Sequence, residues 1–391
     1  MSGEIKKKIF DFSLLRRVFY FVRPYKLHFY ISVALAILLS FATPLRPYLI
    51  QLTIDKATGK TIHTPKFLEW LFSNTDLNNA AKFIIAVTIF QIVFLFVETA
   101  LRFLFAFLTA WLGQSVVKDM RVSIFNKVLH LNLRQFDRTP IGTLTTRTIN
   151  DIESINDIFS DGLIPILADL LSIVIVLVTM FVTDWRLTLI ALIPFPFLLL
   201  ATYYFKESVN KSFIKVRNAV AALNAFVQEH ITGIHIVQAF AAEDREYNKF
   251  KRINKEHRNA NIKSIFAYSV FFPLVEIVLA VSTGLLVWWL AGKAASNPIS
   301  NENLAGTLVA FILYLNQIFR PLRIIADKFN VLQMGMIAAE RVFKVMDNED
   351  TPQPPKGGAL KQLERLKGTI EFKNVWFAYD EDNYVLKNIS F

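Results

Sequence analysis

Ionisable and amide side chains interrupt several long apolar stretches of this sequence. They are Glu98, Arg102, Glu276, Asn316, Gln317 and Arg320. An ionisable group in hydrocarbon is costly, so each is by default a candidate for contact with a transported molecule or for gating. A structural role is the alternative, because Glu98 and Arg102 are four residues apart and can pair on one helix face. Glu276 could likewise pair with Arg102 or Asn316 on a neighbouring helix. The candidates for a substrate pathway are Glu276, Asn316, Gln317 and Arg320.

Familiar catalytic patterns do not accompany these residues. The chain contains no cysteine, which excludes disulfides, thiolate metal sites and cysteine nucleophiles. Gly59-Lys60-Thr61 matches the end of a phosphate-binding loop. That loop requires a glycine five residues earlier, where Ile54 stands, so we do not expect a phosphate site here.

Composition places the chain in the membrane class. Of its 391 residues, 53% are hydrophobic and 36 are Phe, and they gather in blocks rather than in helical stripes. About 20 apolar residues suffice to cross the hydrocarbon layer. The blocks predict membrane-spanning helices at Leu27–Leu45, Ala81–Leu112, Leu163–Val182, Leu187–Phe205, Ile265–Leu290 and Leu304–Phe319. The expected fold is an all-α membrane protein with six spans.

Helical patterns continue beyond these spans on one side of the membrane. The second span continues to about Leu131, and a later excursion covers Lys206–Lys263 with a break at Gly233. The sixth helix passes Pro321 towards Met346. At about 1.5 Å per residue, helices of about 25 residues reach nearly 40 Å from the membrane. Helices of that length imply a partner domain on that side.

Basic residues predict the orientation. The net charge is +11, and Lys and Arg gather before the first span and across 113–161 and 206–263. The positive-inside rule then puts both termini in the cytoplasm, and the excess needs no nucleic-acid partner. Ile9–Val22 is expected to be an interfacial helix closed by Pro24. Arg46–Asn79 is expected to be a polar outer loop with a short amphipathic piece at Phe67–Phe72.

The last stretch, Thr369–Phe391, is the only part with a strand pattern. Apolar and polar residues alternate, and the phase slips by one residue at Asn374, which predicts a bulge or a break. A hairpin this short cannot fold alone, so it is expected to open a soluble domain that is cut off. The expected organisation is an interfacial helix (1–25), a membrane domain (26–346), a Pro- and Gly-containing linker (347–367) and an incomplete soluble domain (368–391).

Three stretches carry a resemblance to a known family. They are HLNLRQFDRTPIGTLTTRTINDI, ITGIHIVQAFAAEDREYNKF and GTIEFKNVWFAYDEDNYVLKNISF. Together with the six spans and ERVFKVMD at the end of the sixth helix, they make the chain resemble a half-transporter of the ATP-binding cassette (ABC) exporters. The similarity is to the multidrug and lipid-flippase kind, lipid A exporters included, and covers essentially the whole length. It implies an exporter transmembrane domain followed by the first strands of a nucleotide-binding domain.

The resemblance implies roles for residues outside the membrane. Tyr379 would stack on adenine, because its ring offers a π-face to the base. A short helix at the bottom of each inner loop, at about 133–139 and 232–239, would dock on a nucleotide-binding domain. The residues implied in that coupling are Arg134, Phe136, Asp137, Ile236, Phe240 and Glu243. Without the resemblance, the same residues would be taken as ordinary packing and turn residues.

Cofactors and partners follow from the same resemblance. ATP and Mg²⁺ would serve the full-length protein, and this chain completes neither site. The phosphate loop, the signature motif and the acidic catalytic motif are expected beyond Phe391, so the chain alone is not expected to hydrolyse ATP. The implied partners are the lipid bilayer, a second half-transporter of the same or another sequence, and a hydrophobic or amphiphilic lipid, drug or peptide. The implied location is a bacterial inner membrane.

Two main functional hypotheses remain. The first is the transmembrane half of an ATP-driven exporter that moves its substrate out of the cytosol or inner leaflet by alternating access. The second is a secondary transporter or channel without an ATP engine, a class that usually has broken or inverted-repeat helices and ionisable residues at the midplane. A non-transporting membrane scaffold is a third. The long inner helices and the strand tail favour the first.

Overall fold

The computed structural model describes residues 12–59, 79–296, 304–351, 368–379 and 383–391. The α-helices are α1 (Phe12–Tyr20), α2 (Lys26–Ala42), α3 (Leu45–Ala57), α5 (Ala80–Leu129), α6 (Leu133–Arg138), α7 (Ile141–Thr146), α8 (Ile152–Asp157), α9 (Leu163–Thr183), α10 (Trp185–Leu192), α11 (Phe195–Thr232), α12 (Ile234–Ala239), α13 (Glu243–Ser296) and α14 (Leu304–Met346). Short turns of other helix types are η1 (Arg23–Tyr25), η2 (Arg147–Asp151) and η3 (Ile158–Gly162). The strands are β1 (Val375–Ala378) and β2 (Tyr384–Ile389).

Within these described residues, six helical stretches are long and apolar enough to cross a membrane. They are Arg23–Ala57, Ala80–Leu129, Ile141–Thr183, Trp185–Thr232, Glu243–Ala295 and Leu304–Leu322. Only 17% to 39% of the residues in each apolar window are buried within the chain, so most of these side chains face outward, as they would towards lipid. The predicted all-α membrane fold with six spans is confirmed, and the chain is an integral, multi-pass membrane protein.

The long helices pass well beyond the hydrocarbon layer. α5 contains 50 residues and α13 contains 54. At about 1.5 Å per residue each is about 75–80 Å long, more than twice the thickness of the hydrocarbon core. α5 begins where the Asn79 side chain accepts hydrogen bonds from the backbone N–H groups of Ala81 and Lys82. Both extensions are therefore continuous with their spans, as the sequence predicts.

The first span is broken, and this corrects the predicted polar loop. Helix α2 stops at Ala42 and α3 resumes at Leu45, because Pro44 and Pro47 lack the N–H groups that a continuous helix needs. The loop predicted from Arg46 is wrong up to Ala57, since α3 continues the helical path there. Apolar residues of α3 pack on α5 and fix it in place. Lys60, Thr61 and the predicted piece at Phe67–Phe72 lie outside the described residues.

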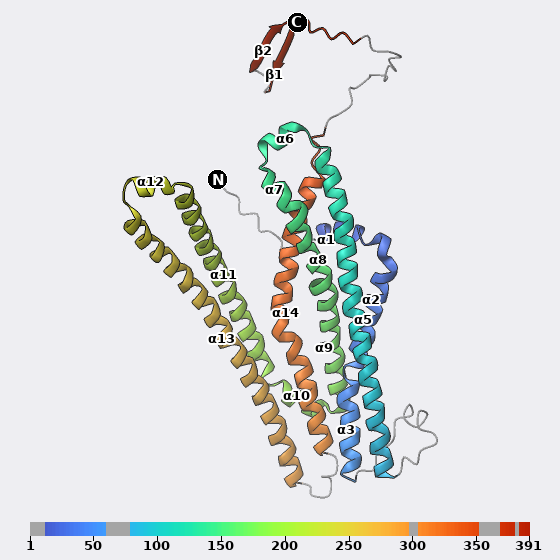
Figure 1. Ribbon diagram of the computed structural model, residues 1–391. Helices are drawn as coiled ribbons and strands as arrows, with labels where there is room; N and C mark the ends of the chain where they lie inside the picture. The colour runs from blue at the N-terminus through green and yellow to red at the C-terminus, as the bar shows by residue number, and fades with distance from the viewer. Residues whose placement is uncertain (1–11, 60–78, 297–303, 352–367, 380–382) are drawn as a thin grey trace.

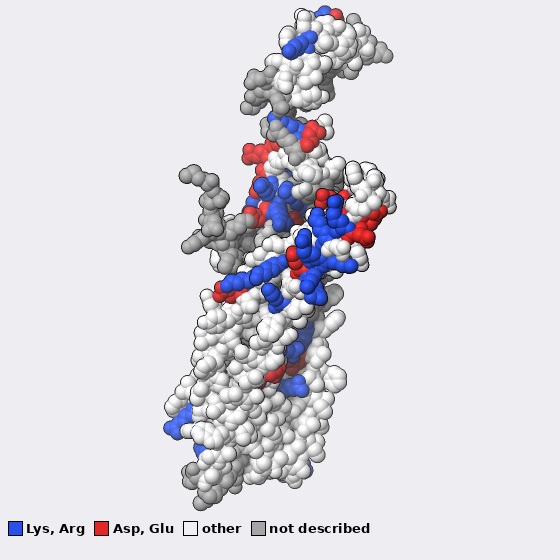
Figure 2. Space-filling model, turned by 90° about the vertical axis from the view of Figure 1, so that its left-hand side faces the viewer, with Lys and Arg blue, Asp and Glu red and all other residues white. Residues whose placement is uncertain are grey.

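Helices α2, α5, α9 and α14 form the main bundle, and α11 and α13 form a separate antiparallel pair (Figure 1). The pair joins the bundle at the end where α10 lies and diverges from it towards the end that carries α12. One buried cluster includes Phe271 of α13 and Tyr314 and Phe319 of α14. On the face shown in Figure 2, most charged side chains gather in the upper half of the molecule, below the hairpin, and the lower half carries only a few.

The C-terminal hairpin has an irregular register. β1 and β2 pair antiparallel, with shifts between Val375 and Phe377 and between Phe377 and Ala378. Asn374 has a φ of 49°, so the predicted break in phase at this residue is confirmed. Strand pairing was predicted from Ile370, but β1 starts only at Val375. Before that residue, the backbones of Phe372 and Phe391 exchange two hydrogen bonds.

Candidate functional site

A cavity of about 700 Å³ lies among α2, α3, α5, α9 and α14. This volume is in the range of small-molecule sites in proteins. Its apolar lining includes Ala36, Leu39, Leu95, Phe105, Ala168 and Ile324. Its polar and charged lining includes Ser40, Arg46, Glu98, Arg102, Asp169, Ser172, Gln317, Arg320 and Lys328. The cavity is thus amphipathic.

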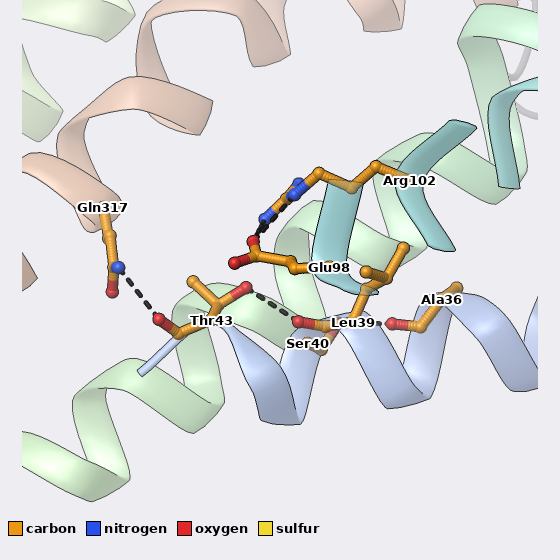
Figure 3. Close-up of polar contacts among 7 residues, drawn as sticks. All are labelled: Ala36, Leu39, Ser40, Thr43, Glu98, Arg102 and Gln317. Carbon is orange, nitrogen blue, oxygen red and sulfur yellow. Dashed lines mark hydrogen bonds and ion pairs between the residues drawn. The ribbon is translucent and has the colours of Figure 1, made fainter. Parts of the chain in front are cut away.

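Two ion pairs hold its carboxylates. The guanidinium of Arg102 donates to Glu98 Oε1 from Nε at 2.8 Å and from Nη2 at 2.6 Å (Figure 3). Glu98 is buried, with a side chain only 11% exposed. The ammonium of Lys328 donates to Asp169 across the α9–α14 contact. The intrahelical Glu98–Arg102 pair predicted from the spacing is confirmed, and it leaves Glu98 little freedom to contact anything else.

Two further guanidiniums line the cavity, and neither is paired with a carboxylate of the described residues. Arg46 follows the break between α2 and α3, and Arg320 lies in α14 beside Pro321. Both side chains are exposed, and no hydrogen bond or ion pair joins either to another described residue. The described lining therefore carries four cations against two carboxylates, a net charge of +2.

The break in the first span is tied to α14. Pro47 has no N–H, so the carbonyl of Thr43 lacks its usual helical donor. Gln317 supplies one, because its Nε2 donates to Thr43 O at 2.9 Å (Figure 3). The hydroxyl of Tyr314 donates to Pro44 O at 3.3 Å. Irregular backbone at membrane depth is tolerated only where such donors or a cavity satisfy it, and here both are present.

The structure separates the four predicted pathway residues into two groups. Gln317 and Arg320 line the cavity, with Gln317 also bonded to the broken backbone. Asn316 and Glu276 are exposed and do not line it. The amide of Asn316 donates to Ile312 O of its own helix at 2.8 Å.

Sequence reasoning did not identify Arg46, Asp169 or Lys328 as residues of this site. The break at Pro44 and Pro47 was the signal for Arg46, because irregular backbone within a span marks a lined cavity. Asp169 forms the ion pair with Lys328. Neither residue of that pair could be placed from spacing, since they are 159 residues apart.

The tips of the two long excursions each carry a short helix, α6 and α12, at the predicted places. Ile236 of α12 is 54% exposed, and Phe240, directly after α12, is 79% exposed. On α6, Arg134 and Asp137 are exposed, whereas Phe136 is half-buried against the chain's own core. Leu133, which the sequence did not suggest, is 82% exposed and gives α6 its free apolar side chain.

The end of α14 is attached to α1 and to the first excursion. Arg17 donates to both carboxylate oxygens of Asp347, at 2.7 and 2.6 Å, and its guanidinium lies over the ring of Phe343 at 4.2 Å. Asn132, just before α6, donates from its backbone and its side chain to Asp350. The chain that follows the sixth helix therefore starts from a fixed position.

The Arg17–Asp347 contact predicts a pH dependence. Hydrogen bonds from Arg17 hold the pKa of Asp347 below its ordinary value of 3.8. A carboxyl with a lowered pKa stabilises the folded form above its ordinary pKa, and that stabilisation is lost as the pH falls through the lowered value. Because both side chains are about half exposed, the contact is worth less than about 1 kcal/mol. We expect Asp347→Asn to speed amide exchange in α1 a fewfold at pH 7, with the difference vanishing as the pH falls below the lowered pKa of Asp347.

The neighbouring residue provides the control. Arg16 is exposed and forms no hydrogen bond or ion pair with the described residues, so Arg16→Gln is expected to leave exchange in α1 unchanged. Equal exchange in wild type and Asp347→Asn at pH 7 would show that the contact does not hold α1.

Tyr379 lies directly after β1. Its side chain is 73% exposed, and its ring meets that of Phe377 edge-on with centroids 4.9 Å apart. An exposed aromatic face at the end of a strand fits a stacking partner such as a nucleotide base.

Comparison with known proteins agrees with this arrangement. The sequence model of the ABC transporter transmembrane region matches residues 29–322, about three quarters of the chain. An uncharacterised ABC transporter ATP-binding protein of Bacillus subtilis is 29% identical over 397 residues, covering 100% of this chain and 61% of the relative. An ATP-dependent lipid A-core flippase of Syntrophus aciditrophicus is 27% identical, covering 73% of this chain and 46% of the relative. Another from Colwellia psychrerythraea is 25% identical, covering 94% and 57%.

Proposed function

Because this chain belongs to the ABC transporter transmembrane family, we propose that it forms the membrane half of an ATP-driven exporter. It spans about three fifths of the length of the Bacillus relative, so the activity concerns the intact protein. Its cargo is a hydrophobic or amphiphilic molecule, a lipid, drug or peptide, taken from the cytosol or the inner leaflet. Alternating access of the cavity to the two sides of the membrane moves the cargo.

The observation that carries this proposal is the connection of the cavity to the exposed tips. The cavity is lined by α5, which continues as one rigid helix to α6, and by α14, which ends at the Arg17–Asp347 contact. A displacement at either end would reach the cavity through unbroken helix. Exposed apolar side chains at the tips, Leu133 and Phe240, suit a docking surface of modest size.

The charge distribution supports the orientation. On the face shown in Figure 2, most charged side chains gather towards the end of the molecule that carries α6 and α12, and the opposite part carries only a few (Figures 1 and 2). By the positive-inside rule the charged end is cytoplasmic, with both termini on that side. The membrane is a bacterial inner membrane, in keeping with the bacterial relatives.

ATP and Mg²⁺ serve the intact protein, and in this chain Tyr379 supplies the face against which adenine stacks. Loss of a stacking aromatic costs about 1–3 kcal/mol per base. Tyr379→Ala is therefore expected to weaken ATP binding by the intact protein about 5- to 150-fold, as measured by equilibrium binding of a fluorescent ATP analogue. Tyr379→Trp keeps the face and serves as the control. Unchanged nucleotide affinity in Tyr379→Ala would reject the stacking role.

The partner is a second half-transporter, a copy of this chain or a related one. The pair of α11 and α13 diverges from the bundle, and at its tip Ile236 of α12 and Phe240, directly after α12, are exposed. The two halves together place two cassettes under the four tips, where Arg134, Phe136 and Asp137 of α6 and Glu243 at the start of α13 take part in the coupling.

Transport assays separate the exporter from the runner-up, a secondary transporter. The broken first span and the charged cavity are features that secondary transporters share. In inverted vesicles containing the intact protein, we expect accumulation of a fluorescent amphiphile with ATP and no ion gradient. Accumulation that requires a proton or sodium gradient and ignores ATP would favour the secondary transporter.

A further inference from the structure

The cations that line the cavity outnumber the carboxylates that could neutralise them. Of the four cations on the described lining, Arg102 is committed to Glu98 and Lys328 to Asp169. Arg46 and Arg320 remain, one on each of the two helices that meet at the broken first span. Because each carboxylate of the described lining already has its own cation, neither of them is left to neutralise Arg46 or Arg320.

Unpaired positive charge within a membrane-spanning segment is energetically unfavourable. An arginine within a membrane-spanning segment costs free energy unless it meets an anion, backbone carbonyls or water in a cavity. A guanidinium is always charged and offers a planar fork of donors that matches the oxygens of a phosphate. Two such forks in the lining of one cavity suit a phosphate-bearing group.

The rest of the lining constrains what carries that phosphate. Leu39, Leu95, Phe105 and Ile324 line the same cavity and would contact an apolar moiety. We propose that Arg46 and Arg320 bind the phosphate of an anionic amphiphile, a lipid with a phosphate-containing headgroup, while the apolar lining contacts its acyl chains. This inference rests on the proposed exporter function and gives the class of its cargo.

The neighbouring residues explain why these two arginines are available. Gln317 is one turn before Arg320 and gives its Nε2 to the carbonyl of Thr43, which fixes α14 against the break that precedes Arg46. The backbone of the break is thereby satisfied by an amide, and neither guanidinium is needed to cap it. Arg46 and Arg320 are thus free to bind a ligand.

The test compares two lipids that differ in charge. The intact transporter is reconstituted in phosphatidylcholine nanodiscs, and binding of spin-labelled phosphatidylglycerol and spin-labelled phosphatidylcholine is measured. We expect wild type to prefer phosphatidylglycerol, and Arg46→Gln or Arg320→Gln to reduce that preference about tenfold each, the effect of one charge-assisted contact. Arg320→Lys keeps the charge and should retain part of the preference. Arg186→Gln, outside the cavity at the start of α10, should leave it unchanged.

Several outcomes would overturn the proposal. Equal preference in wild type and both glutamine variants would do so, as would a parallel loss of both lipids. Displacement of phosphatidylglycerol by millimolar inorganic phosphate would mean that the site takes a free anion rather than a lipid. Loss of preference accompanied by a changed oligomeric state or melting temperature would make the two arginines structural.

The exporter function is tested separately, with the same purified protein reconstituted in vesicles. ATP-dependent movement of labelled phosphatidylcholine in vesicles, together with an unchanged headgroup preference in the variants, would reject the anionic cargo alone. Absence of any ATP-dependent lipid movement in wild type, with phosphatidylglycerol still bound through Arg46 and Arg320, would reject the exporter and leave the binding site standing.

Discussion

The Glu98→Leu variant is expected to lose about 2–3 kcal/mol of folding free energy. Glu98 is buried and accepts two hydrogen bonds from Arg102, so its removal strands a cation within a membrane span. Breaking a fully buried pair by removing one partner costs about 3–5 kcal/mol. The Arg102 side chain is 55% exposed and lines the cavity, where water can solvate it, so the loss falls below that range. Thermal unfolding in detergent micelles shows how the stabilities of wild type and the variants rank.

A double-mutant cycle isolates the interaction. Arg102→Leu and the double variant Glu98→Leu/Arg102→Leu complete it. Replacing both members of an ion pair by apolar residues is often neutral, so we expect the double variant to be within about 1 kcal/mol of wild type. A double variant that is less stable than Glu98→Leu alone would mean that the two residues do not act as a pair.

The Gln317→Leu variant is expected to lose about 1–2 kcal/mol of folding free energy, the lower part of the range for leaving an acceptor without a donor, because this acceptor is part-buried. The acceptor is the carbonyl of Thr43, which the proline at position 47 has deprived of its helical partner. The loss should lower the midpoint of thermal unfolding by several degrees. It should also loosen the contact between α3 and α14, which hydrogen exchange in α3 reports.

The preceding residue gives a matched control for this variant. Asn316 carries the same amide group on the same helix, but it donates to Ile312 of its own turn and its side chain is exposed. Asn316→Leu is therefore expected to change stability by less than about 0.5 kcal/mol. Equal losses in Gln317→Leu and Asn316→Leu would indicate a general effect of removing a polar group from α14.

Much of the fold could be predicted because its determinants are local. Apolar blocks of about 20 residues fix the spans, Gly233 ends α11, and the absence of helix-breaking residues after Leu112 lets α5 continue to Leu129. The sequence also contains the cause of the broken first span, in Pro44 and Pro47. That break was missed because the polar residues after Arg46 resemble a loop, whereas their partners on α5 and α14 are distant in sequence.

The candidate site was less predictable, because a cavity depends on which helix faces meet. Spacing alone identified the Glu98–Arg102 pair, which lies within one helix. Asp169 and Lys328 lie on different helices, and nothing near either residue in the sequence indicates the other. Gln317 and Asn316 are adjacent and chemically alike, yet only Gln317 lines the cavity. Tertiary packing decides which of two such neighbours lines the cavity, and this packing cannot be inferred from a single sequence.

If the protein is an exporter, the cavity between α2, α3, α5, α9 and α14 opens in turn to the two sides of the membrane. The chain has no cysteine, so a single Ser172→Cys on the cavity wall can report access in an intact transporter freed of other cysteines. Val182→Cys, on a side chain 82% exposed at the end of α9 opposite α6 and α12, is the control.

Labelling with a membrane-impermeant maleimide from each side of sealed vesicles gives the answer. Without nucleotide, Ser172→Cys should react from the cytoplasmic side only. With ATP, Mg²⁺ and orthovanadate it should react from the outer side only, while Val182→Cys reacts from the outer side in both conditions. Labelling of Ser172→Cys from the same side in both conditions would contradict alternating access through this cavity.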